Sequence, residues 1–271
     1  MKPHEGKISI GTLGSAATFA GEATRRMREI YPEFSEPVYF PSMDACWLEL
    51  KQGTVDAVIL GTERTGQPHH GEALISHGFY VIAELAQPLK CSLYVKPSTR
   101  KSAIRSISGH GSIFQCTAWL DREFPGIPRA AHGLNSVEAA RAMIAGDGSM
   151  AVVGTGSLPG VVSGLEEMAR DIDDSAISNW WAVSGKPLFS EEPDSLVVTS
   201  RCGPDGRLGE LIMAVAGAGY VLQTAAAFPV NSGVKVYDYI LAFAGQGARS
   251  AVEMAISRFS GARLAGAYNR R

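Results

Sequence analysis

The chain has neither an excess of charge of one sign nor a long apolar run. Its 271 residues carry 25 Lys and Arg against 27 Asp and Glu, a formal net charge of -2. Proteins that bind nucleic-acid phosphates normally present a basic face, so we expect no nucleic-acid partner. No stretch approaches the ~18 apolar residues that cross a bilayer, so we expect no membrane span. Met1 to Lys7 is polar and lacks the apolar centre of a signal peptide, which predicts a cytoplasmic protein.

Cysteine is scarce and is not arranged for metal binding. The four cysteines form no CxxC pair and have no histidine at zinc spacing, which predicts reduced and mostly buried thiols. The doublet His69-His70 is a poor metal site because adjacent side chains diverge. The chain contains neither a GxGxxG sequence nor a Walker loop. We therefore expect no metal ion and no organic cofactor.

Apolar residues are abundant, at 45% of the chain, and their pattern predicts an α/β fold. Residues 7–13 read as a strand, 14–18 as a turn of small residues and 19–30 as a helix. Similar Gly/Ser-rich turns at 106–112 and 154–157 follow or open other elements. Such strand-turn-helix units predict parallel sheets covered by helices, with ligands at the carboxyl ends of the strands.

A change in pattern near residue 190 predicts two modules. Residues 186–194 carry two prolines and two glutamates and read as a linker. After it, the order strand-helix-strand-strand-helix-strand is typical of a ferredoxin-like module. We predict a two-lobed α/β region over residues 1–190, with its second lobe at about 88–165, and a ferredoxin-like module over 195–271.

The order of several short motifs resembles that of the prephenate dehydratase family over about residues 7–270. The turn Gly14 to Phe19 is similar to that family's Gly-Pro-x-Gly-Thr-Phe, and Ser108-Gly109-His110 with Gln115-Cys116 is similar to its Ser-His-Pro-x(4)-Gln-Cys. Residues 136–140 resemble its Ser/Thr-Ala-Glu-Ala-Ala helix. The resemblance implies a two-lobed catalytic region, of the periplasmic-binding-protein type, followed by an ACT regulatory domain.

The departures from that family fall where its chemistry resides. Its Thr-Arg-Phe is replaced by Asn179-Trp180-Trp181, and its Glu-Asn-Ser by Glu63-Arg64-Thr65. In the family, the threonine is held to assist loss of the ring hydroxyl and the arginine to hold a substrate carboxylate. A tryptophan at position 181 instead resembles the prephenate decarboxylases. In the ACT region, residues 226–229 have lost the polar groups of the family's effector motif, so we expect phenylalanine not to act as an effector.

The resemblance and the turns together imply a set of site residues. We expect the substrate carboxylates between the turn Ala17-Thr18, the loop Arg64-Thr65 and the turn 108–112, with Asn179 and Trp181 facing the ring. Three other interpretations stay open, in which the tryptophans are core residues, Arg64 is a solvated charge and His110 braces its turn. The expected catalytic residues are Thr18, Glu63, Thr65 and Asn179. The expected substrate-binding residues are Ala17, Phe19, Arg64, Ser108, His110, Gln115 and Trp181.

Three functions remain open from the sequence. The first is a lyase acting on prephenate or a close analogue, with decarboxylation retained and dehydration in doubt. The second is an ordinary prephenate dehydratase in which Asn179 or Thr65 compensates. The third is a non-catalytic binding or regulatory protein. ACT modules leave an open sheet edge, so we also expect a homodimer or homotetramer.

Overall fold

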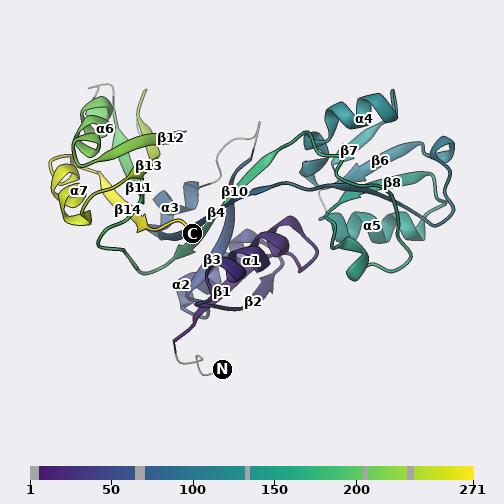
Figure 1. Ribbon diagram of the computed structural model, residues 1–271, viewed down its shortest axis with the longest axis horizontal. Helices are drawn as coiled ribbons and strands as arrows, with labels where there is room; N and C mark the ends of the chain where they lie inside the picture. Colours follow the sequence, from purple (N-terminus) through teal and green to yellow (C-terminus); the bar gives the residue numbers. More distant parts are fainter. Residues whose placement is uncertain (1–5, 65–70, 132–134, 204–206, 231–234) are drawn as a thin grey trace.

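The computed structural model describes residues 6–64, 71–131, 135–203, 207–230 and 235–271. For Glu63, Arg64, Ala73, Ser112 and Ala131 only the backbone is described. The chain forms two sheets with helices packed against them (Figure 1). This is the mixed α/β fold expected from the alternating pattern. None of the described helices is long and apolar enough to cross a membrane.

The first lobe is built on one half of a nine-stranded sheet, in which β1 pairs in parallel with both β2 and β3. The carboxyl ends of β1 and β3 therefore meet at one edge of the sheet. The antiparallel strand β10 lies between β3 and β4. The elements of this lobe are β1 (Ile8–Leu13), α1 (Phe19–Ile30), β2 (Phe34–Phe40), α2 (Met43–Gln52), β3 (Ala57–Arg64), α3 (Glu72–His77), β4 (Tyr80–Pro88) and β10 (Ile177–Ser184).

The second lobe has its own five-stranded sheet of order β7-β6-β8-β5-β9. The chain enters it after β4 and returns through β10, so two strands join the lobes (Figure 1). The elements are β5 (Ser92–Val95), η1 (Lys101–Ala103), β6 (Ser106–Gly109), η2 (Gly111–Gln115), α4 (Thr117–Glu123), β7 (Arg129–Ala131), α5 (Ser136–Ala145), β8 (Met150–Gly154), η3 (Leu158–Gly160) and β9 (Glu166–Ala169).

The C-terminal part has the expected β-α-β-β-α-β order, but its sheet is not separate from that of the first lobe. Strand β14 pairs with β4 at Gly266 and Val81, so one sheet runs from β12 to β2. The segment 185–194 after β10 leads from the first lobe into β11. The elements are β11 (Ser195–Cys202), α6 (Arg207–Gly217), β12 (Tyr220–Pro229), β13 (Tyr237–Gly245), α7 (Arg249–Ile256) and β14 (Arg263–Tyr268).

Side-chain caps set the starts of helices α2 and α5. The Ser42 side chain accepts from Ala45 N at the start of α2, and Gly53 ends that helix in the left-handed region at φ 74°. At α5, Asn135 and Glu138 form a reciprocal capping box. Residues 106–109 form strand β6, and a 3₁₀ turn follows over Gly111–Gln115, so helix α4 begins only at Thr117.

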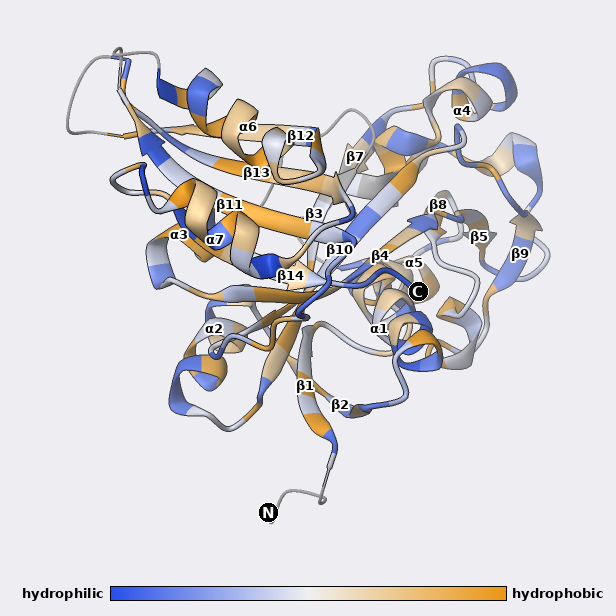
Figure 2. Cartoon of the chain, turned by 60° about the vertical axis from the view of Figure 1, so that its left-hand side comes forward, coloured by the Kyte–Doolittle hydropathy of each residue, from blue (hydrophilic) through white to orange (hydrophobic). Residues whose placement is uncertain are grey.

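The core lies on both faces of the long sheet. Figure 2 shows apolar residues concentrated along β11 and β13. One cluster joins the two modules, because Trp181 and Val183 of the first lobe pack with Val197, Ile240 and other residues of the C-terminal part. This shared burial makes the C-terminal part an integral component of the structure.

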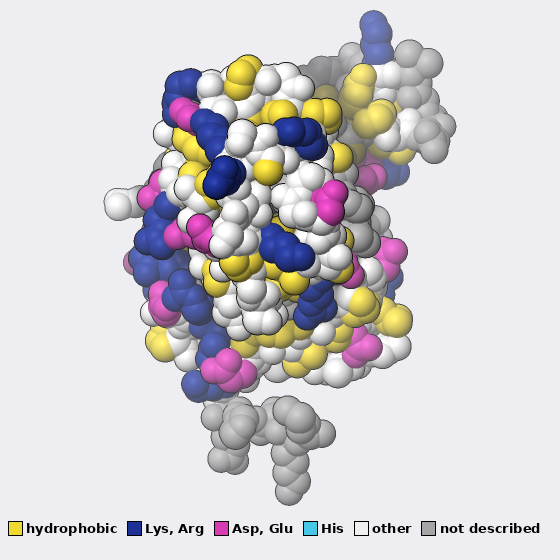
Figure 3. All heavy atoms as spheres, turned by 90° about the vertical axis from the view of Figure 1, so that its right-hand side faces the viewer, with side chains coloured by type: hydrophobic (Ala, Val, Ile, Leu, Met, Phe, Trp, Pro, Cys, Tyr) yellow, Lys and Arg dark blue, Asp and Glu magenta, His cyan; other side chains and the backbone are white. Residues whose placement is uncertain are grey.

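The outer face of the second lobe carries mixed charges. Figure 3 shows Lys and Arg side chains on this side of the molecule interspersed with Asp and Glu. The ion pairs Arg129–Asp121 at 2.6 Å, Lys101–Glu123 at 2.9 Å and Arg170–Glu167 at 2.6 Å belong to this lobe. Neighbouring charges of opposite sign cancel at a distance, so these pairs create no field of one sign.

We expect the protein to self-associate through the exposed edge of strand β12. It is an outermost strand of the described sheet, its ten residues carry no charge, and Val221 is 66% exposed. Uncharged edges of this length pair readily with another strand. We expect light scattering at micromolar concentration to give a dimer or tetramer, and Val221→Lys to shift the mass towards the monomer. A monomeric mass for the parent protein would contradict this prediction.

Candidate active site

A cavity of about 600 Å³ lies where the two lobes face each other. The first lobe contributes the turn after β1, the start of α2, the middle of β3 and strand β10, while the second lobe contributes His110 and the start of α5. Most of the lining is apolar, including Phe19, Trp47 and Trp180. A largely apolar cleft with a few polar groups at strand ends is typical of a small-molecule site.

Thr18 and Phe19 line this cavity, as the sequence analysis expected. The Thr18 hydroxyl is already engaged in its own turn, because it donates to Ser15 O at 2.7 Å and accepts from Gly21 N at 3.2 Å. Gly21 allows this tight start of α1, since a Cβ there would come within 2.2 Å of Ser15 O. Thr18 therefore shapes the helix N-terminus at the cavity rather than offering a free proton.

Ala17 has a different role from the expected one. It is 1% exposed, is not among the lining residues, and packs in a cluster of the second lobe. Its carbonyl accepts from Thr155 Oγ1 at 2.9 Å. This part of the turn thus holds the second lobe, and the expected contact of Ala17 with a substrate stays a prediction.

A carboxylate reinforces that contact between the lobes. Glu22, in the first turn of α1, accepts from Ser157 N at 3.2 Å and from the Ser157 hydroxyl. Phe19 packs against core clusters of both lobes. The same turn thus forms part of the cavity wall and keeps the lobes together.

Strand β10 presents Ser178 and Trp180 to the cavity, where Asn179 and Trp181 were expected. Ser178 and Trp180 line the cavity, whereas Trp181 is 2% exposed in the core that joins the first lobe to the C-terminal part. Successive side chains of a strand alternate between its faces, so Asn179 and Trp181 share one face and Ser178 and Trp180 share the other. Neither Asn179 nor Trp181 is among the described residues that line the cavity, and their expected contact with the substrate ring stays a prediction.

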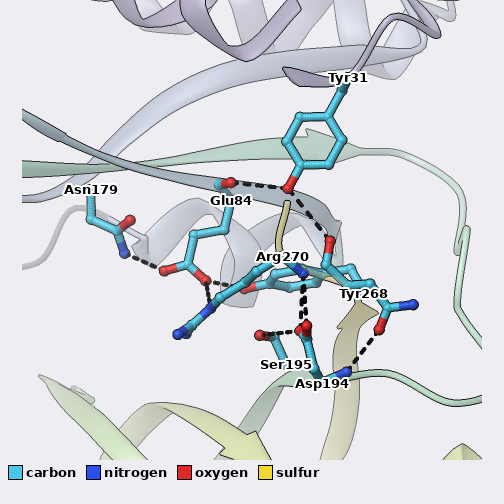
Figure 4. A network of polar contacts seen from close by, with 8 residues as sticks. Tyr31, Glu84, Asn179, Asp194, Ser195, Tyr268 and Arg270 are labelled. Atoms are coloured by element: carbon cyan, nitrogen blue, oxygen red, sulfur yellow. Dashed lines mark hydrogen bonds and ion pairs between the residues drawn. The ribbon is translucent and has the colours of Figure 1, made fainter. Parts of the chain in front are cut away.

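Asn179 is held by a carboxylate on the neighbouring strand. Its Nδ2 donates to Glu84 Oε1 at 2.8 Å, and Glu84 Oε2 accepts from the Tyr268 hydroxyl at 2.9 Å and from Arg270 Nε at 3.1 Å (Figure 4). Burial, together with the adjacent Glu84, raises the pKa of Tyr268 well above its usual value. The phenol therefore stays protonated at neutral pH and continues to donate.

The second lobe brings one predicted and three unpredicted polar residues to the cavity. His110 lines it as expected, together with Asn135, Ser136 and Glu138 at the start of α5. Asn135 Oδ1 accepts from Val137 N at 3.0 Å and Glu138 N at 3.1 Å, so the capping box points this helix N-terminus at the cavity. The helix dipole favours negative charge there. The Ser136–Ala140 motif was the signal in the sequence that could have located these residues.

Ser108 and Gln115 do not line the cavity. Both are buried, at 3% and 7% exposure, and the Gln115 carbonyl accepts from Asp174 N at 2.7 Å. Strand β6 continues through Ser108, which places that side chain inside the lobe. The expected contacts of Ser108 and Gln115 with a substrate stay predictions.

The remaining expected residues lie at the end of β3. The backbones of Glu63 and Arg64 pair with Asn179 and Ser178 of β10. The side chains of Glu63 and Arg64, and the whole of Thr65, lie outside the described residues. The register places the Arg64 backbone directly opposite Ser178, which lines the cavity.

The described lining holds two titratable groups, His110 and Glu138, and neither lysine nor arginine. No group of three or more His, Cys, Asp or Glu suited to a metal is found among the described residues. The expectation of no cofactor remains a prediction. The arrangement defines a two-lobed α/β protein with a cleft whose polar groups are hydroxyls, an amide, an imidazole, a carboxylate and helix N-termini.

The comparisons with known proteins identify the family. A family model for prephenate dehydratase matches residues 10–186, and the chain belongs to that family. It is 24% identical over 245 residues to a bifunctional chorismate mutase/prephenate dehydratase of Stutzerimonas stutzeri, covering 88% of this chain and 65% of that protein. The chain thus spans less than two thirds of the length of the curated relatives that it matches.

Two solved structures share the fold. A prephenate dehydratase from Arthrobacter aurescens, in complex with L-Phe, superposes with a TM-score of 0.81 at 20% identity, covering 97% of this chain and 90% of that one. A protein described as a novel type of quorum quenching acylase, GqqA, gives 0.78 at 14% identity, covering 97% and 98%. At these identities the likeness extends to the fold alone.

The contact between the lobes leads to a mutational prediction. Glu22→Ala removes the charged acceptor of two hydrogen bonds from the partly buried Ser157, so we expect the free energy of unfolding to fall by about 1–3 kcal/mol. Glu22→Gln keeps an acceptor oxygen, so its free energy of unfolding should fall by less. Denaturant unfolding measures both variants. Equal stability of the parent protein and Glu22→Ala would contradict the assigned contact.

Proposed function

We propose that the protein is a cytoplasmic lyase acting on prephenate or a close analogue, with decarboxylation retained and dehydration in doubt. The observation that carries this proposal is the position of Asn179. Where the family has its threonine, this chain has an amide that is bound to Glu84 and is not among the described lining residues. The neighbouring position, an arginine in the family, is Trp180, which lines the cavity.

The two reactions differ in what leaves with the carbon dioxide. In both, the bond from the ring to its carboxylate breaks and its electron pair moves into the ring. In dehydration that pair expels the ring hydroxyl, which leaves as water after taking up a proton. In simple decarboxylation a ring carbon takes the proton and the hydroxyl stays. General acid help to a poor leaving group contributes about 10²–10⁴-fold, so loss of the usual donor disfavours dehydration most.

The cavity supports binding and decarboxylation of such a substrate. The apolar wall around Trp180 removes water from a bound ring carboxylate, which favours loss of carbon dioxide. The N-termini of α1 and α5 favour negative charge at the opposite side. His110 is the described lining residue best suited to move a proton near neutral pH.

We propose Arg64 as the cation that anchors a substrate carboxylate. The described lining has neither lysine nor arginine, and the position of the family arginine is occupied by Trp180. The Arg64 backbone pairs with Ser178 at the cavity wall. A guanidinium suits bidentate contact with a carboxylate.

A second candidate is an ordinary dehydratase, and Ser178 favours it. Ser178 is 3% exposed and lines the cavity one position before Asn179. A serine hydroxyl there supplies the kind of donor that the family's threonine provides. A non-catalytic binding protein is the third candidate. We further propose that residues 195–271 form an ACT regulatory domain, based on their element order.

Incubation with prephenate distinguishes these functions. We expect release of carbon dioxide and a non-aromatic keto acid, detected by mass spectrometry and by the absence of phenylpyruvate absorbance. Phenylpyruvate that is lost in Ser178→Ala but kept in Asn179→Ala would establish the ordinary dehydratase instead. Unchanged prephenate that still binds would support the non-catalytic protein.

The proposed anchor is tested by Arg64→Ala. Losing a bidentate contact to a desolvated carboxylate should cost roughly 2–5 kcal/mol of binding free energy. We expect prephenate binding by calorimetry to become undetectable while circular dichroism stays unchanged. Arg26→Ala is the matched control, since Arg26 pairs with Glu29 on the outer face of α1. Equal binding by Arg64→Ala and the parent protein would overturn the assignment.

A further inference from the structure

The Ser136 hydroxyl lies in the wall of the cavity without a hydrogen-bond partner among the described residues. Ser136 is the first residue of α5, lines the cavity and is 1% exposed. Its hydroxyl is not one of the fully enclosed polar atoms either, so it opens into the cavity. The Thr18 hydroxyl differs, because its own turn already uses it. A buried hydroxyl without a partner is costly, and a ligand oxygen that reaches it removes that cost.

The start of α5 gives Ser136 a second donor. The first N–H groups of a helix have no acceptor within the helix. Asn135 Oδ1 accepts from Val137 N at 3.0 Å and from Glu138 N at 3.1 Å. Ala139 N donates to Asn135 O at 3.1 Å. None of the described residues accepts from Ser136 N, so this residue has two donors available at one point, an O–H and an N–H.

The charge around Ser136 decides which kind of oxygen it binds. Glu138 lines the same cavity, and its Oε2 accepts from Asn135 N at 3.2 Å. This carboxylate already supplies part of the negative charge that the α5 dipole favours. A second carboxylate beside it would be repelled, whereas an uncharged oxygen would not. A carbonyl oxygen accepts two hydrogen bonds, which matches the two donors of Ser136.

We propose that Ser136 binds the keto oxygen next to the side-chain carboxylate of the substrate, and so determines specificity for an α-oxo acid. This assignment rests on the proposed function, which places the pyruvyl group of a prephenate-like substrate in the cavity. The carboxylate of that group is bound by Arg64, as proposed above. The ring lies against Phe19 and Trp180 of the first lobe.

Ser178 provides a comparison within the same cavity. It is 3% exposed, lines the cavity and bonds to no described residue through its hydroxyl. It belongs to β10 of the first lobe, whereas Ser136 belongs to α5 of the second lobe (Figure 1). Trp180, two residues further along β10, shares its face, so Ser178 faces the ring end of the ligand. Only Ser136 should therefore discriminate at the carbon next to the carboxylate.

Calorimetry with three acids tests this assignment. Phenylpyruvate, phenyllactate and 3-phenylpropionate share a ring and a carboxylate, and differ only in carrying a keto oxygen, a hydroxyl or neither. We expect the parent protein to bind phenylpyruvate roughly tenfold more tightly than 3-phenylpropionate, with phenyllactate between them. Ser136→Ala should bring that ratio close to one, because phenylpyruvate loses its donors. Ser136→Thr keeps a hydroxyl and should keep most of the ratio.

The controls separate the keto contact from a general loss of the site. Ser136→Ala retains the capping box of Asn135 and Glu138, so 3-phenylpropionate should bind it as it binds the parent protein. Ser178→Ala should keep the preference for phenylpyruvate. Ser250→Ala, the same change in the first turn of α7 outside the cavity, should also keep it.

Two results would overturn the assignment. The first is a parent protein that binds none of the three acids, and the second is a Ser136→Ala variant with the parent's ratio. The measurement does not depend on turnover. A ratio lost in Ser136→Ala, in a protein that leaves prephenate unchanged, would support the contact and contradict the lyase. Turnover of prephenate with an unchanged ratio would support the lyase and contradict the contact.

Discussion

The carboxylate of Glu84 joins three parts of the protein that are distant in sequence. It receives hydrogen bonds from Asn179 of β10, Tyr268 of β14 and Arg270 beyond it, and its side chain is only 12% exposed. A buried charge is tolerated only where such partners satisfy it. The position of β10 therefore depends on the C-terminal strand as well as on its neighbours β3 and β4. Since Ser178 and Trp180 line the cavity, the shape of the cavity depends on the same contacts.

The continuous sheet also joins the C-terminal part to the first lobe. Strand β14 pairs with β4, and Trp181 shares a core with Val197 and Ile240 of the C-terminal part. A further cluster of contacts surrounds Asp194, which accepts from Arg270 N at 3.0 Å and from the Ser195 hydroxyl at 2.8 Å (Figure 4). A change in the C-terminal part is thus transmitted to the first lobe through packing and hydrogen bonds together.

Local signals in the sequence predicted much of the fold. The caps at Ser42 and Asn135, the turn at Gly14 and the apolar strands all follow from short-range chemistry. The pairing of β14 with β4 was not predictable in this way, because it joins residues 185 positions apart through a single bridge at Gly266 and Val81. Long-range pairing leaves no periodic signal in either segment.

The site was predicted less well than the fold, and the reason is the two-residue period of a strand. Motif order located β10, but whether Ser178 or Asn179 faces the cavity depends on register, and a shift of one residue exchanges the two faces. Similarly, Ala17 belongs to the right turn yet is used to contact Thr155 of the second lobe. By contrast, Thr18, Phe19 and His110 line the cavity as the turns predicted.

The contact of Glu84 with both Asn179 and Tyr268 is the central claim, and a double-mutant cycle measures it directly. Unfolding free energies are determined for the parent protein, Asn179→Ala, Tyr268→Phe and the double variant. Groups that share one buried carboxylate are coupled, so we expect the effects to depart from additivity by about 0.5–3 kcal/mol. Additive effects within experimental error would show that Asn179 and Tyr268 act independently, and would contradict the link between the C-terminal strand and the cavity wall.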